Sequence, residues 1–88
     1  ESNSPKVFGV IGRGVHCDVR FTDASISLFH ARFWQEDTYT FLEDLNSTNK
    51  TRYVYGEGTV QLKPYEPLIV DPGTSIILGR HQFSSEVI

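Results

Sequence analysis

Residues 25–51 read SISLFHARFWQEDTYTFLEDLNSTNKT, and this segment contains the clearest strand and loop signals of the chain. Two runs in it have the composition of β-strands, Ala31–Gln35 and Tyr39–Leu45, and the polar residues 36–38 between them predict a turn. Small hydroxyl and amide residues gather at both ends of this hairpin. Because such side chains bond nearby backbone groups, they favour loops. We therefore expect two polar loops close together, an arrangement that suits holding an anion or a peptide.

Shorter strand-like segments flank this hairpin on both sides. They are Lys6–Ile11, Cys17–Phe21, Thr51–Tyr55, Val60–Leu62, Leu68–Val70, Ser75–Leu78 and Phe83–Ile88. Glycine and proline separate them, and no segment has a helical period. Many short strands with turns between them predict an all-β sandwich or barrel. We expect residues 1–5 to form a polar lead-in and residues 6–88 to form a single domain.

Composition narrows the class of protein. The 88 residues are 39% hydrophobic and 22% charged, which is typical of a globular domain. The formal charge of −3 argues against a general nucleic-acid binder, which needs a basic surface. Cys17 is the only cysteine, so neither an internal disulfide nor a cysteine-based zinc site is expected. No apolar run is long enough to span a membrane, and we expect no metal and no cofactor.

Three short motifs occur in a fixed order along the chain. They are Gly12-Arg13, Ser27-Leu28-Phe29-His30 and Ser47-Thr48-Asn49-Lys50. Their order and spacing resemble the signature of the forkhead-associated (FHA) domain, which is Gly-Arg, then Ser-x-x-His, then a Ser/Thr-Asn-Gly turn. The resemblance covers most of the chain from about Phe8 onward. It implies an FHA-like β-sandwich of short, mostly antiparallel strands, with loops at one end that read phosphothreonine peptides.

The resemblance assigns phosphopeptide contacts to Arg13, Ser27, Thr48 and Asn49. Arg13 would bind the phosphate, because a guanidinium matches phosphate oxygens in a bidentate fork. Ser27 and Thr48 would add hydroxyl contacts to the phosphate, and Asn49 would bond the peptide backbone. Taken singly, these residues are also typical of ordinary loops, as a solvated arginine, capping hydroxyls and a turn asparagine.

Gly12 and His30 are assigned a structural role by the same resemblance, with His30 bonding loop backbone and holding Ser27 in place. A hydrolytic triad of Ser27 and His30 with Asp23 or Asp44 is the alternative from another class. Such triads need a base oriented by a buried acid, and an oxyanion hole beside a strained nucleophile turn. No such turn is visible in the sequence, so we expect the chain not to be an enzyme.

Several positions depart from the family pattern. Leu28 and Phe29 stand where basic or polar residues are frequent, and Lys50 stands where glycine is usual. Loss of one bond to a charged phosphate would weaken binding at least tenfold, at about 1.4 kcal/mol per decade. Lys50 would disfavour a left-handed turn by about 1–2 kcal/mol, or reshape it. Lys50 or Arg52 could restore some positive charge.

The predicted function follows from these departures and from the front end of the sequence. Only Glu1–Lys6 precedes the strand that leads into Gly12, where the family usually has a further hairpin. Residues 51–70 are also weakly similar, in their proline-containing course, to the FHA domain of the mediator of DNA damage checkpoint type. We therefore expect a nuclear, non-catalytic interaction module of a DNA-damage-response scaffold, which forms homodimers and has weakened phosphothreonine recognition. A fully competent phosphothreonine-peptide reader is the alternative.

Overall fold

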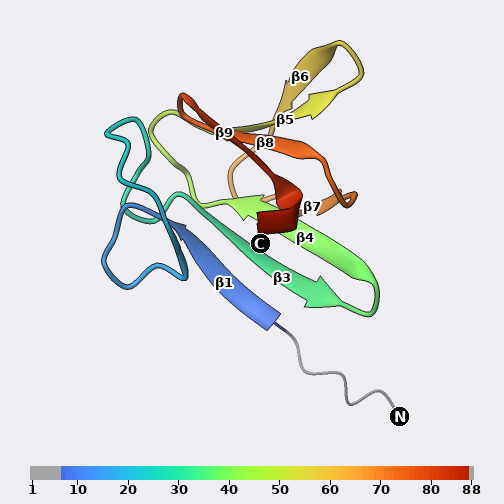
Figure 1. Ribbon diagram of the computed structural model, residues 1–88, viewed down its shortest axis with the longest axis horizontal. Coiled ribbons are helices and arrows are strands. Elements are labelled where there is room, and N and C mark those ends of the chain that lie inside the picture. The colour runs from blue at the N-terminus through green and yellow to red at the C-terminus, as the bar shows by residue number, and fades with distance from the viewer. Residues whose placement is uncertain (1–6, 88) are drawn as a thin grey trace.

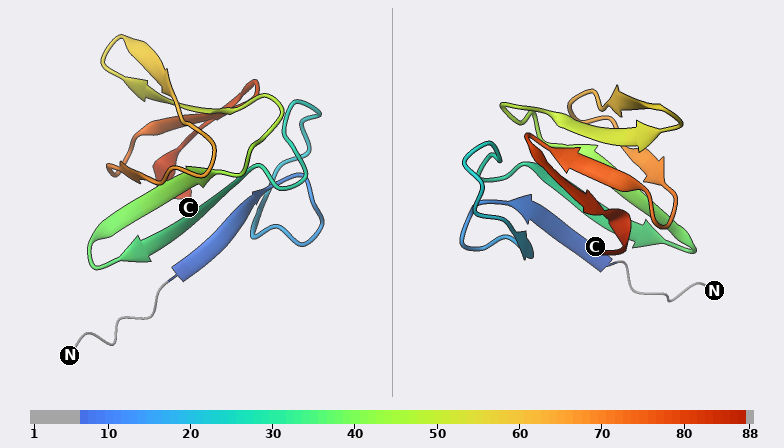
Figure 2. Two further views of the ribbon diagram at one scale, coloured as in Figure 1. Left: turned by 180° about the vertical axis from the view of Figure 1, so that it is seen from behind. Right: turned by 45° about the horizontal axis from the view of Figure 1, so that its top comes forward.

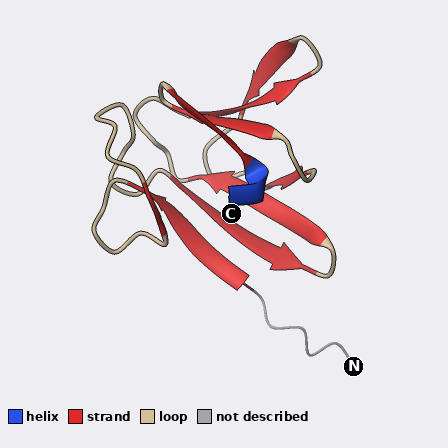
Figure 3. Ribbon diagram, in the orientation of Figure 1, coloured by secondary structure: helices blue, strands red, loops and turns tan. Residues whose placement is uncertain are grey.

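The computed structural model describes residues 7–87, and strands make up nearly all of its regular structure (Figure 3). The elements in chain order are β1 Val7–Gly12, β2 Val19–Arg20, β3 Ala31–Glu36, β4 Tyr39–Asp44, β5 Thr51–Tyr55, β6 Gly58–Gln61, β7 Leu68–Val70, β8 Ser75–Leu78, β9 His81–Ser84 and the 3-10 turn η1 Ser85–Val87. The predicted lead-in, residues 1–5, lies outside the described residues.

These strands form two sheets that lie one above the other (Figures 1 and 2). One sheet has the order β2-β1-β3-β4-β7, and the other has the order β6-β5-β8-β9. Among the described strand pairs, β1 with β2 is parallel and the others are antiparallel. The predicted all-β sandwich of short, mostly antiparallel strands is confirmed.

The core lies between the two sheets because apolar residues alternate along the central strands. In β3, Ala31 and Phe33 are buried while Arg32 between them is exposed, as strand geometry requires. The same inner layer collects apolar side chains from both sheets. The buried cluster consists of Ile11, Ile26, Ala31, Phe33, Leu42, Leu62, Val70, Ile76 and Leu78.

The C-terminal strand differs from its prediction. The sequence predicted a strand at Phe83–Ile88, but β9 is His81–Ser84 and a 3-10 turn follows it. Gly79 has φ +60°, and this left-handed turn pairs Leu78 with His81, so the strand begins earlier than expected. The predicted strand Cys17–Phe21 is also shorter in the structure, where β2 contains only two residues.

Four loops gather at one end of the sandwich. They connect β1 to β2, β2 to β3, β4 to β5 and β8 to β9, and they lie opposite the β3–β4 turn (Figure 1). The central hairpin produces this arrangement, because β3 begins and β4 ends at the same edge, with Ala31 paired to Asp44. The part of the chain that the structure describes has no helix long and apolar enough to cross a membrane.

Candidate functional site

Ser27 lies at the centre of the loop end. Its carbonyl accepts a hydrogen bond from the Arg13 N–H at 3.0 Å, and its Oγ accepts one from the Thr48 N–H at 3.0 Å. The structure therefore brings together three of the predicted phosphate contacts from three different loops. A hydroxyl can accept and donate at once, so the Ser27 proton remains available to an anion.

The Arg13 side chain is bonded to the loop that contains Ser27. Its Nε donates to the carbonyl of Ile26 at 2.5 Å, which orients the guanidinium while leaving its two Nη groups out of that bond. Arg20 in turn donates through Nε to the Arg13 carbonyl at 3.0 Å. The guanidinium predicted to bind phosphate is thus held in position before any ligand arrives, which lowers the entropic cost of binding.

Hydrogen bonds of Ser25 join the β2–β3 loop to the β4–β5 loop and to the β8–β9 turn. The Asn49 side chain donates from Nδ2 to the Ser25 carbonyl at 2.8 Å, and the Ser25 Oγ accepts the Arg80 N–H at 2.9 Å. A side chain at Gly79 would come within 2.5 Å of the Ser25 carbonyl oxygen, so Gly79 allows this close approach. No local pattern in the sequence points to Ser25 or Arg80, because their contact spans 55 residues.

A cavity of about 430 Å³ lies beside Asn49. Its lining residues are Ala24, Ser25, Asn49, Gly79 and Arg80. Arg80 supplies positive charge there, with its side chain 78% exposed and 3.6 Å from the Asp23 carboxylate. Asp23 accepts the Ser25 N–H at 2.8 Å, and this bond is the main reason why the pKa of Asp23 is lowered from 3.8. The cavity therefore continues the loop end as a polar groove.

His30 is fully buried below these loops. Its Nδ1 lies 3.0 Å from the Ser27 nitrogen and its Nε2 lies 2.9 Å from the Lys50 carbonyl. Because the Ser27 N–H can only donate, Nδ1 accepts and the ring proton lies on Nε2, which donates to Lys50. Burial lowers the pKa of His30 below 6.5, against the opposing effects of the Lys50 bond and the Asp44 charge. The neutral imidazole joins the Ser27 loop to the end of the Asn46–Lys50 loop.

Gly12 permits the loops to pack closely. A Cβ atom at Gly12 would collide with the backbone of Leu28, and would lie 2.9 Å from the Ser27 carbonyl oxygen. Backbone of this kind cannot move aside as a flexible side chain could. Only glycine therefore fits between β1 and the Ser27 loop.

Asp44 organises the remaining loop and was missed as a structural residue. This fully buried carboxylate accepts bonds from the Ser47 N–H at 3.1 Å, the Ser47 hydroxyl at 2.5 Å and the Thr51 hydroxyl at 2.7 Å. The three bonds compensate the loss of hydration of a buried charge. An aspartate at a strand end, three residues before a serine, is a recognisable local pattern that could have predicted the first two bonds.

The alternative catalytic triad does not form in this arrangement. Both ring nitrogens of His30 are bonded to backbone groups, so neither is directed at the Ser27 hydroxyl. Asp44 is bonded to Ser47 and Thr51, and Asp23 is bonded to Ser25. The described residues also contain no group of three His, Cys, Asp or Glu side chains that could hold a metal ion. The arrangement is suited to binding and offers no positioned base.

Lys50 keeps the left-handed turn that the sequence left in doubt. Its φ is +68°, and Asn46 at the other end of the loop has φ +59°. The Lys50 carbonyl is used by His30, and Arg52 donates from Nη2 to the Gly79 carbonyl at 3.1 Å. Lys50, at a position where the family pattern has glycine, therefore preserves the turn at the cost of backbone strain.

Comparison with known proteins agrees with this geometry. The FHA domain family model matches residues 9–79, and no curated protein sequence gives a significant match. Among solved structures, the FhaA FHA domain in complex with the intracellular domain of Rv3910 is 27% identical, with TM-score 0.71, over 92% of this chain and 81% of that one. The FHA domain of an Arabidopsis thaliana hypothetical protein is 26% identical, with TM-score 0.74, over 90% and 64% of the two chains. The MEK1 FHA domain, in complex with a HOP1 phosphothreonine peptide, is 25% identical, with TM-score 0.69, over 86% and 76%. The family match spans most of the sequence and the sandwich agrees with it, so the chain belongs to the FHA domain family.

Proposed function

We propose that this domain is a non-catalytic interaction module that binds phosphothreonine peptides at Arg13, Ser27, Thr48 and Asn49. One observation carries the proposal: three loops meet at Ser27, with Arg13 and Thr48 bonded directly to it. A phosphothreonine carries about −1.5 to −2 charges. The Arg13 guanidinium and the Ser27 hydroxyl supply the charge-assisted hydrogen bonds that such a group requires.

Titration with a degenerate phosphothreonine peptide library tests this function. We expect binding tighter than about millimolar that requires the phosphate, corresponding to more than about 4 kcal/mol. Arg13→Ala should abolish binding, because it removes the fixed guanidinium. Arg32→Ala is the matched control, since Arg32 lies on the sheet and pairs with Glu43 at 2.6 Å. Equal affinity for phosphorylated and unphosphorylated pools would contradict the function.

We further propose that phosphate binding is weaker than in a domain with a basic residue after Ser27. Leu28 adds no positive charge at this position and is 53% exposed. Leu28→Arg should therefore tighten phosphopeptide binding about tenfold, the value of one charge-assisted bond. An unchanged affinity would show that Leu28 does not limit phosphate recognition.

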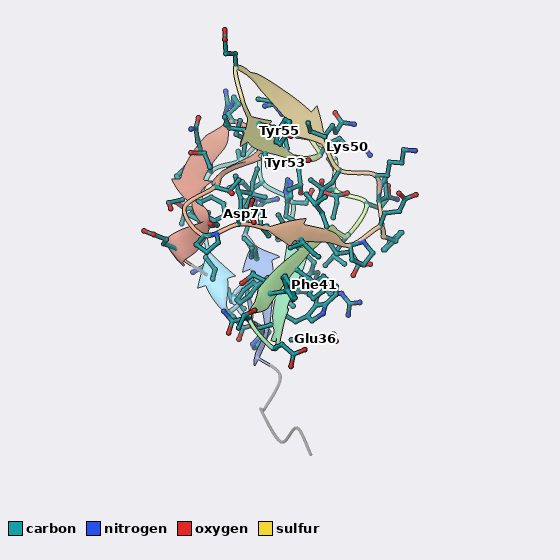
Figure 4. The ribbon with its side chains drawn as sticks, turned by 90° about the vertical axis from the view of Figure 1, so that its right-hand side faces the viewer. Glu36, Phe41, Lys50, Tyr53, Tyr55 and Asp71 are labelled. Atoms are coloured by element: carbon teal, nitrogen blue, oxygen red, sulfur yellow. The ribbon has the colours of Figure 1, made fainter. Side chains whose placement is uncertain are left out.

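A second proposal is that the domain forms homodimers through the outer face of the β2-β1-β3-β4-β7 sheet. On this face Trp34 stacks on Phe41 with ring centroids 5.3 Å apart, and Ile69 lies opposite Phe41 on the neighbouring strand. Ile69 and Tyr39 are 50% and 54% exposed. Figure 4 shows Phe41 on β4 in the lower layer, away from Tyr53 and Tyr55 on β5. Trp34 and Phe41 are half-buried beside Ile69 and Tyr39, and exposed apolar side chains grouped in this way favour association.

Sedimentation equilibrium at high micromolar concentration tests the homodimer. We expect a dimer that Ile69→Lys converts to a monomer, because the substitution buries a charge in the contact. Val15→Lys changes an exposed apolar residue at the loop end and should leave the dimer intact. A clean monomer of the parent chain would overturn the proposal.

A place in a nuclear DNA-damage-response scaffold is proposed on the family resemblance alone, and imaging of the endogenous protein after DNA damage tests it.

A further inference from the structure

Two large apolar residues occupy the middle of a turn at the loop end. Leu28 and Phe29 lie between Ser27 and His30, and they are 53% and 57% exposed. Turn positions of this kind favour glycine and small polar residues. Apolar side chains that stay exposed add little to the stability of the fold. Large apolar residues at turn positions are therefore expected where a partner binds.

The backbone beneath these side chains is firmly held. The Leu28 carbonyl accepts bonds from the Gly14 N–H at 3.0 Å and from the Cys17 thiol at 3.1 Å. The Phe29 ring reaches the same loop, since a Cβ atom at Gly14 would lie 3.5 Å from it. Val15 follows Gly14 and is 72% exposed. We call Val15, Leu28 and Phe29 the apolar rim.

The apolar rim adjoins the candidate phosphate site. Leu28 directly follows Ser27, whose hydroxyl bonds the Thr48 N–H. An extended peptide advances about 3.3–3.6 Å per residue, so the neighbours of a phosphothreonine bound at Ser27 reach the rim. The cavity beside Asn49 and Arg80 is lined by different residues, so the rim is a separate surface.

We propose that the apolar rim binds an apolar side chain that flanks the phosphothreonine of the peptide, which makes Phe29 a specificity-determining residue. This inference rests on the proposed phosphothreonine-binding function. The phosphate brings the peptide to Ser27, and contact with the rim then removes apolar surface of both partners from water. A polar flanking residue would leave the rim exposed. The rim therefore discriminates between phosphopeptides that the phosphate site alone would treat alike.

The test uses two phosphothreonine peptide pools that differ only in the flanking positions, which are Leu, Val and Phe in one and Ser, Gln and Gly in the other. Isothermal titration should give about tenfold tighter binding of the apolar pool, in line with the burial of one large side chain. Phe29→Ser should reduce this ratio of affinities to about two or less. Tyr55→Ser is the matched control, because Tyr55 is 73% exposed at the end of β5 farthest from the β4–β5 loop and should leave the ratio unchanged.

The failures of the two proposals are distinguishable. Equal affinity for both pools, with binding that still requires the phosphate, would overturn the apolar rim alone. Binding of neither pool in a phosphate-dependent way would overturn both the rim and the function on which it rests. Self-association that Phe29→Ser abolishes would assign the rim to a second copy of the chain and would also overturn the inference.

Discussion

His30 is buried and bonds the Ser27 and Lys50 backbones through its two ring nitrogens. His30→Ala leaves both groups without a partner, and each unsatisfied buried group costs about 1–3 kcal/mol. We therefore expect the midpoint of urea unfolding to fall clearly, whether or not phosphate binds. Ser27→Ala removes the partner of only the more exposed Thr48 N–H, which water can replace. Its expected cost is about 0.5–1 kcal/mol, more than a pure surface contact would give. Greater destabilisation by Ser27→Ala than by His30→Ala would reverse the two roles.

Protonation of His30 should make the fold sensitive to acid. Burial lowers the pKa of His30 in the folded state below 6.5, and a proton on Nδ1 would also displace the Ser27 N–H. Between that lowered pKa and about 6.5 the unfolded chain binds more protons than the folded chain. The free energy of unfolding is therefore highest above about pH 6.5 and falls as the pH is lowered through this window.

Urea titrations at pH 7.5, 6.5 and 5.5 measure this effect. The destabilisation caused by His30→Gln should shrink as the pH falls, because the parent loses its advantage. His16→Gln is the control, since His16 is exposed and should leave the pH dependence in place. A constant difference between parent and His30→Gln across the three pH values would contradict the assignment.

The loop between β4 and β5 contains a strained residue at its end. Lys50 has φ +68°, a region that costs a non-glycine residue about 1–2 kcal/mol. Lys50→Gly should raise the free energy of unfolding by about 0.5–1 kcal/mol, the remainder being offset by the greater entropy of glycine in the unfolded chain. Differential scanning calorimetry provides the measurement. Thr38→Gly, at a loop position without positive φ, should destabilise the domain instead, and stabilisation by both variants would show that strain is not the cause.

The elements themselves were largely predictable, for a physical reason. Strands β5, β7 and β8 have the predicted bounds because β-branched and aromatic residues end there at glycine, proline or polar positions. The bounds of β9 were not predictable from the sequence. The left-handed turn at Gly79 starts this strand early, and no local pattern reveals which residues pair across the turn. A strand boundary set by such a turn depends on its partner strand.

Only the family resemblance predicted that Arg13, Ser27, Thr48 and Asn49 lie at one end of the domain. Local chemistry predicts polar loops, but it does not predict that Arg80 bonds Ser25 across 55 residues or that Thr48 bonds Ser27 across 21. The charge distribution shows the same limit. The formal charge of −3 hides a basic loop end, where Arg13, Arg20, Arg52 and Arg80 are held by backbone bonds or beside Asp23.

Ser25 precedes β3 of one sheet and bonds the turn between β8 and β9 of the other sheet, so its contacts influence how fast the domain unfolds. Its carbonyl and hydroxyl bond residues 24 and 55 positions away, so these contacts close long stretches of chain. Hairpins form from local contacts first, and contacts that distant are expected to form late. Ser25→Ala removes the hydroxyl that accepts the Arg80 N–H and keeps the carbonyl bonded to Asn49, so it should speed unfolding in stopped-flow measurements while leaving the refolding rate nearly unchanged. An equal slowing of refolding would place the loop end in the folding nucleus, whereas the expected result makes its closure the step that sets the lifetime of the folded domain.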